Sequence, residues 1–133
     1  MKTERRTNKT FLIGSILTGL VSAFLAFDVV LKVLQLAPAV ETTTQLGYPV
    51  ETILWIGVIE LVFLVLYLVP RTSILGAVLL TGYLGGAIAT HVRVGSPLLG
   101  YTFFPIYVAA MVWGGIYLRD ARLRTLLPLR HPL

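Results

Sequence analysis

Four long apolar stretches fill most of the chain. Residues 11–27, 72–90 and 94–118 contain no charged side chain, and residues 52–70 contain one, Glu60. A helix needs about 20 residues to cross roughly 30 Å of hydrocarbon, and each stretch is long enough for that purpose. Lipid offers no water to the backbone, which must then bond to itself, and this requirement favours helices. We therefore predict an all-α fold, an integral membrane four-helix bundle.

Turn-forming residues separate the apolar stretches. Pro38, Gly47 and Pro49 fall within residues 36–50, which we interpret as the longest loop. The sequence contains neither an internal repeat nor a low-complexity tract. We predict a single four-span transmembrane domain over residues 1–133, with spans at approximately 11–35, 51–69, 73–93 and 101–119.

The low charge content argues against several classes of protein. Charged residues make up 13% of the chain, whereas a soluble domain carries about 25%. This composition disfavours a water-soluble enzyme, a nucleic-acid-binding domain and a disordered chain. The chain has no cysteine, which excludes disulfides, thiol redox chemistry and cysteine-ligated metals within it.

The basic residues are distributed unevenly about the predicted spans, and this asymmetry sets the orientation. Lys32 and Arg93 lie on one side of the predicted bundle. The positive-inside rule places the richer side, with both termini, in the cytoplasm. The net charge of +5 is then a topology signal, and we expect no nucleic-acid partner. The richer side holds nine basic residues: Lys2, Arg5, Arg6, Lys9, Arg71, Arg119, Arg122, Arg124 and Arg130.

The first apolar stretch follows a basic segment, as the core of a signal peptide does. Asp28 and Lys32 lie between this stretch and the cleavage-like sequence at residues 37–39. We therefore expect an uncleaved membrane helix rather than a signal peptide.

Small residues recur at four-residue spacing in two of the predicted spans. Gly82 and Gly86 form a G-x-x-x-G motif, and Ser15, Gly19 and Ala23 repeat the spacing in the first span. Such residues let membrane helices approach closely. We expect packing within one bundle; a dimer interface or close approach to a flat ligand are the alternatives.

Charged residues within the apolar stretches are the most informative feature. Asp28 and Lys32 are spaced i, i+4, so they share a helix face and can pair. Glu60 lies nine residues beyond Glu51, or about 13 Å deeper at 1.5 Å per residue. An ionised residue at the bilayer centre costs about 2.5–3.5 kcal/mol on insertion scales. Glu60 is therefore expected to face inward and to be paired or neutral.

On the predicted topology, the charged and polar groups converge on one mouth in the outer leaflet. Structural interpretations stay open: an Asp28–Lys32 ion pair, a snorkelling Arg93 and a helix-end His91. We predict no metal site, because a haem held by two histidines needs a second intramembrane histidine and His131 lies in the predicted tail. The predicted acid–base residues are Glu60, His91 and Asp28, and the predicted ligand-contacting residues are Lys32, Arg93, Tyr83, Thr90 and Tyr107.

Several sequence blocks resemble the DoxX-like family of small four-span bacterial membrane proteins. The most specific blocks are residues 80–87 (LTGYLGGA) and 90–95 (THVRVG), and residues 68–72 (LVPRT) also match. The resemblance covers roughly residues 20–128 and implies a multi-pass protein of the bacterial cytoplasmic (inner) membrane. It also implies kinship with membrane subunits associated with quinone-linked sulfur oxidation and oxidative-stress complexes. No catalytic residue carries over from the family, and this chain lacks the cysteines of some redox relatives.

Three functions remain open at this point. The leading expectation is a redox-associated subunit that binds a lipophilic ligand such as a quinone, with a membrane oxidoreductase or a second copy of the chain as partner. The first alternative is a cofactor-independent membrane enzyme that uses Glu, His and Asp acid–base chemistry on a lipophilic substrate. The second is a structural or assembly partner of a membrane complex.

Overall fold

The computed structural model describes the backbone of residues 2–127 and the side chains of residues 8–127. Arg130 and His131, both assigned to the cytoplasmic side, lie outside the described residues, as do the side chains of residues 2–7. The all-α prediction is confirmed, since the described residues form helices and turns and no strand. The elements are α1 (Lys2–Val33), α2 (Ala37–Gln45), α3 (Thr52–Leu68), the short turn η1 (Pro70–Thr72), α4 (Ser73–Val94), the π-helical turn η2 (Leu98–Thr102), α5 (Phe104–Arg119) and α6 (Ala121–Leu126).

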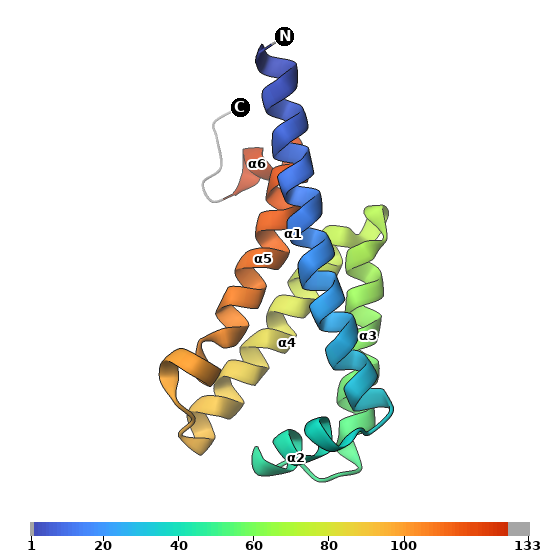
Figure 1. Cartoon of the computed structure of the whole chain (residues 1–133), viewed down its shortest axis with the longest axis vertical. Coiled ribbons are helices and arrows are strands. Elements are labelled where there is room, and N and C mark those ends of the chain that lie inside the picture. Colours follow the sequence, from blue (N-terminus) through green and yellow to red (C-terminus); the bar gives the residue numbers. More distant parts are fainter. Residues whose placement is uncertain (1, 128–133) are drawn as a thin grey trace.

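The four long helices run alternately up and down and pack as a ring. Helix α1 packs along α5 and α3, and α4 packs along α3 and α5. The start of α1 and the short helix α6 lie at one end of the bundle, whereas α2 and η2 lie at the other (Figure 1). This arrangement puts the start of α1 and helix α6 on one side of the bundle; which side of the membrane that is stays a prediction.

Three helical segments are long and apolar enough to cross a bilayer: Asn8–Val33, Pro70–Val94 and Leu98–Arg119. Helix α3 has 17 residues and falls among the shorter apolar helices. At 1.5 Å per residue it extends about 25 Å, a little less than the hydrocarbon core. The predicted count of four spans is therefore not confirmed and remains a prediction.

Large apolar side chains are exposed along the surface of the helices. Large side chains such as Phe27, Trp55 and Leu99 are 63%, 66% and 78% exposed. In water, an apolar surface this extensive would drive association. Its presence on every long helix, together with the three long apolar helices, identifies an integral membrane protein.

Close helix crossings occur at glycines outside the predicted motif. A Cβ added at Gly76 would lie 2.2 Å from the backbone nitrogen of Tyr67, and one at Gly115 would lie 2.3 Å from Oγ1 of Thr18. A Cβ at Gly14 would lie 2.8 Å from the carbonyl oxygen of Gly115. Because these glycines have no side chain, α3 can approach α4 and α1 can approach α5. Small residues are expected at such contacts in lipid, where burial of apolar surface does not drive helices together.

The interpretation of residues 36–50 as a loop is wrong over residues 37–45, which form α2. Pro38 occupies the first turn, where a helix loses nothing by a missing N–H. The carbonyl of Leu36 accepts the first bonds, and Thr42 donates its hydroxyl to the carbonyl of Pro38 at 2.7 Å. Pro38 therefore lies in the first turn of a helix and does not mark a loop.

The predicted orientation can be tested by labelling single cysteines, because the native chain has none. Glu41 of α2 and Thr125 of α6 are both exposed and lie at opposite ends of the bundle (Figure 1). We expect a membrane-impermeant maleimide to label Glu41→Cys in intact bacterial spheroplasts and to label Thr125→Cys only after permeabilisation. The reverse pattern would overturn the orientation, and labelling of both from outside would overturn the even number of crossings.

Candidate functional site

A cavity of about 790 Å³ lies in the half of the bundle that α2 covers. Its volume falls within the range of about 300–1,000 Å³ that is usual for ligand pockets. Side chains from α1, α2, α3, α4, η2 and α5 line it, and most of them are apolar. The apolar lining includes Phe24, Leu25, Ile59, Leu84, Phe104 and Val108.

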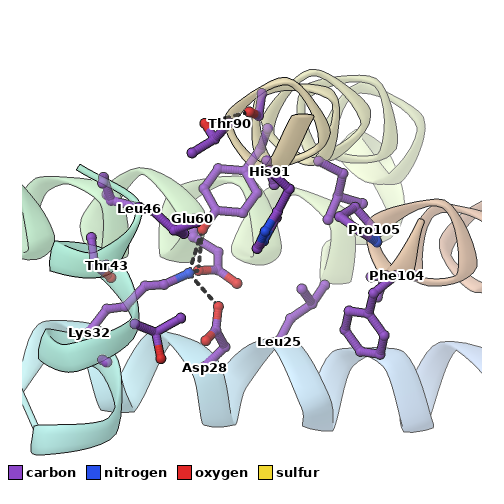
Figure 2. Close-up of a pocket in the computed structure, with 18 of the residues that line it drawn as sticks. Leu25, Asp28, Lys32, Thr43, Leu46, Glu60, Thr90, His91, Phe104 and Pro105 are labelled. Carbon is purple, nitrogen blue, oxygen red and sulfur yellow. Dashed lines mark hydrogen bonds and ion pairs between the residues drawn. The ribbon is translucent and has the colours of Figure 1, made fainter. Parts of the chain in front are cut away.

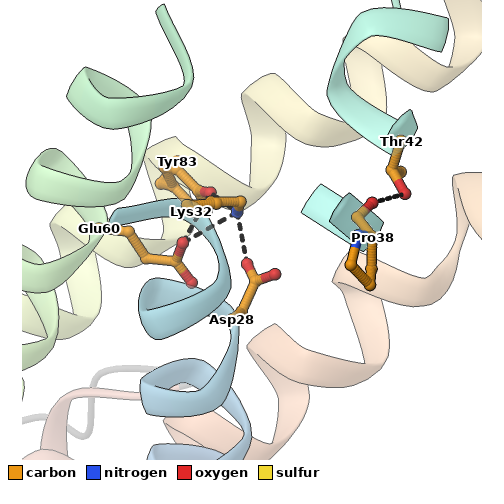
Figure 3. A network of polar contacts seen from close by, with 6 residues as sticks. All are labelled: Asp28, Lys32, Pro38, Thr42, Glu60 and Tyr83. Carbon is orange, nitrogen blue, oxygen red and sulfur yellow. Dashed lines mark hydrogen bonds and ion pairs between the residues drawn. The ribbon is translucent and has the colours of Figure 1, made fainter. Parts of the chain in front are cut away.

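A charged cluster, defined by Asp28, Lys32, Glu60 and Tyr83, lies on one wall of this cavity (Figures 2 and 3). The Lys32 ammonium donates to a carboxylate oxygen of Asp28, to Oε2 of Glu60 at 2.9 Å and to the hydroxyl of Tyr83. The Tyr83 hydroxyl donates to the same Glu60 oxygen at 2.9 Å. The cluster thus joins α1, α3 and α4 through one ammonium group.

The local sequence explains how the cluster assembles. Asp28 and Lys32 lie one turn apart on α1, so both point to the same side. Gly57 lies three residues before Glu60 on α3, and a Cβ there would lie 2.8 Å from Cβ of Lys32. The absence of that Cβ brings α3 close to α1 where the ion pair forms.

Exposure differs sharply among the charged groups. The Glu60 side chain is fully buried, at 0%, whereas the side chains of Lys32 and Asp28 are 15% and 34% exposed. Glu60 therefore lies behind Lys32 as its counter-charge, and Asp28 is the charged group most open to the cavity. Figure 2 shows Asp28, Lys32 and His91 directed toward the same space.

Two more predicted residues lie on the same cavity, His91 and Thr90. The Nδ1 atom of His91 is 2.9 Å from the hydroxyl of Ser96, and its ring stacks on Tyr101 with centroids 6.1 Å apart. Thr90 donates to the carbonyl of Gly86 at 2.9 Å. Its hydroxyl oxygen, 2.8 Å from the hydroxyl of Tyr48, therefore acts as the acceptor of that second bond.

Arg93 and Tyr107 do not line the cavity, in contrast to their predicted placement. Arg93 follows His91 by two residues, or about 200° around the helix, and its side chain is exposed. Tyr107 is 51% exposed, whereas its neighbour Val108 lines the cavity. Both placements rested on depth in the membrane, which does not say which face of a helix a residue occupies.

Sequence reasoning missed the contribution of α2 and gave a ligand contact at the glycine motif only as an alternative. Ala39, Thr42 and Thr43 line the cavity from α2, and their helical spacing was a usable signal. Gly82 and Gly86 also line it, and a Cβ added at either would meet nothing within 4 Å. The motif therefore does not make a tight crossing within the described bundle. Its open face favours the alternative of close approach to a ligand.

Comparison with known proteins yields one match. The sequence model of a family described as the DoxX-like family matches residues 16–115. No curated protein and no solved structure matches the chain significantly. The matched range contains every residue of the charged cluster and all the residues of α2, α3 and α4.

Proposed function

The chain belongs to the DoxX-like family, and we propose that this integral membrane protein binds a lipophilic molecule such as a quinone in the cavity beneath α2. One observation carries the proposal: a ligand-sized, mainly apolar cavity whose wall holds a small charged cluster. Ligand sites combine these two features, because apolar area provides affinity and a few fixed polar groups set orientation.

The residues take different roles in this proposal. Asp28 and His91, which are open to the cavity, lie where they can contact the polar end of the ligand. Glu60 is covered and holds the Lys32 ammonium in place, so we assign it a positioning role. The burial of its carboxylate is the reason that we favour binding over acid–base catalysis by Glu60.

The redox association is part of the same proposal. A quinone bound here would place the protein beside membrane oxidoreductases, in keeping with the resemblance to redox-associated subunits. The apolar walls suit a quinone ring and the first part of its tail. The protein would supply binding and orientation, and a partner enzyme would supply the electron transfer.

We expect a lipophile to copurify with the protein after extraction in a mild detergent. The organic extract of the wild-type protein, analysed by mass spectrometry, should contain one lipophilic compound in near-stoichiometric amount. Gly86→Leu places a side chain in the cavity and should remove most of it. Gly85→Leu is the matched control: Gly85 lies in the same helix with open space at its Cβ, but it does not line the cavity. Equal amounts of the compound in both variants would argue against binding in this cavity.

A further inference from the structure

Every hydrogen-bond donor of the charged cluster is already in use. An ammonium group has three N–H donors, and those of Lys32 go to Asp28, Glu60 and Tyr83. The single O–H of Tyr83 goes to Glu60. A ligand that needs to receive a hydrogen bond therefore finds no free donor in the cluster.

Two carboxylate oxygens in the cluster have no donor among the residues that the structure describes. Glu60 bonds through Oε2, and its buried Oε1 has no partner. Asp28 bonds through one oxygen, and Figure 3 shows its other oxygen turned away from Lys32. Two carboxylates against one ammonium leave a formal charge of −1. The cluster is thus short of donors and disfavours an anionic ligand.

Helix α4 gives the cavity a bare strip of backbone beside Tyr83. Gly82 and Gly86 are one turn apart on α4, and both line the cavity with open space where a Cβ would lie. Tyr83 lies between them in sequence and directs its hydroxyl into the cluster. A planar ring can lie against such a strip without meeting a side chain.

The Tyr83 side chain shows that the cluster can accommodate the hydroxyl of an aromatic ring. Its phenolic oxygen receives a bond from Lys32 and donates one to Glu60 at 2.9 Å. A hydroxyl on an aromatic ring is thus compatible with both the charge and the apolar surroundings of the site.

We propose that the lipophile is a planar ring bearing a hydroxyl group, which donates a hydrogen bond to the free oxygen of Asp28 while the ring lies against Gly82 and Gly86. This inference rests on the proposed function, because it names the chemistry of the ligand in the same cavity. Asp28 is then the residue that selects the polar end, and the glycine strip selects a flat shape.

A matched pair of probes tests the hydroxyl directly. 4-Octylphenol donates one hydrogen bond, and 4-octylanisole is its methyl ether and donates none. Saturation binding of each tritiated probe is measured on the full chain in lipid nanodiscs, with empty nanodiscs subtracted. A hydrogen bond to a carboxylate contributes enough that the phenol should bind about tenfold tighter or more.

Two pairs of variants locate the contacts. Asp28→Leu should reduce the preference for the phenol to about threefold or less, whereas Glu41→Leu, which removes an exposed acid of α2 outside the cavity, should leave it within about twofold. Gly82→Leu should weaken binding of both probes about tenfold or more, and Gly85→Leu should change neither by more than about twofold. If Asp28→Leu does not fold, the ratio of the affinities of the two probes for the wild-type protein still tests whether the site recognises the hydroxyl.

The outcomes separate the two proposals. Equal affinity for phenol and ether, with binding of both probes lost in Gly82→Leu, overturns recognition of the hydroxyl and still supports a lipophile site in the cavity. A phenol preference that survives in folded Asp28→Leu overturns Asp28 as the acceptor. Absence of saturable binding by either probe, with no copurifying lipophile, overturns both the inference and the proposed function.

Discussion

Replacing Lys32 by methionine is expected to reduce the free energy of unfolding by about 3–5 kcal/mol, the range for removing one partner of a buried ion pair. Lys32 is the only cation in the charged cluster, and it donates to both carboxylates and to Tyr83. Methionine has a similar length, so the loss is one of charge and hydrogen bonds rather than of volume. Glu60, fully buried on α3, would be left with the Tyr83 hydroxyl and a nearby like charge. Reversible unfolding of the purified protein in mixed micelles measures the effect.

The control for this substitution is Lys9→Met, which removes an exposed lysine from the same helix. Its effect should stay within about 0.5 kcal/mol, as for most surface substitutions. Lys32→Met combined with Glu60→Leu should recover much of the lost stability, because the uncompensated buried charge is gone. A single Lys32→Met variant as stable as wild type would mean that the ion pair contributes nothing to holding α1 against α3.

The second large effect is expected at Gly76, where α4 meets the end of α3. A Cβ at this position would lie 2.2 Å from the nitrogen and 2.5 Å from Cα of Tyr67, both backbone atoms that cannot move alone. The two helices would have to separate, and overpacking of this kind costs about 1–3 kcal/mol or more. We expect Gly76→Ala to destabilise the protein by about 3 kcal/mol, at the upper end of that range, as measured by the same unfolding assay.

Gly85→Ala is the internal control for Gly76→Ala. Gly85 lies nine residues further along the same helix, and its Cβ would meet nothing within 4 Å. Alanine is the better helix former, so this variant should be as stable as wild type or more stable by up to about 1 kcal/mol. Similar losses for the two variants would show that the close approach at Tyr67 does not set the cost.

The sequence predicts the helices better than their mutual contacts. Apolar stretches and turn residues place α3, α4, α5 and the end of α1 within a few residues, because the cost of unpaired backbone in lipid leaves few options. The start of α1 lies nine residues before the predicted residue 11, at Lys2. Helix α2 was missed, since its nine residues carry no long apolar run. The close crossings fall at Gly14, Gly57, Gly76 and Gly115 rather than at the G-x-x-x-G motif. Spacing shows where a helix has a small face, but it does not show which neighbour covers that face.

In the candidate site, too, some features follow from the sequence and others depend on tertiary contacts. The structure brings Asp28, Lys32, Glu60 and Tyr83 together in one cluster, because a buried charge must find a partner. Arg93 has no such constraint, since a long basic side chain near a helix end can reach the polar interface. The order of exposure within the cluster, with Glu60 behind Lys32, depends on the approach of α3 at Gly57. That approach is a tertiary contact, which one sequence does not specify.

The central claim is that the cavity beneath α2 holds a lipophilic ligand. The most direct test is the amount of copurifying lipophile per chain, compared between the wild-type protein and the Gly86→Leu and Gly85→Leu variants. The claim predicts a near-stoichiometric compound in the wild-type protein and in Gly85→Leu, and a loss of most of it in a folded Gly86→Leu protein. Wild-type protein without a bound lipophile, or a Gly86→Leu protein that retains it in full, would contradict the claim.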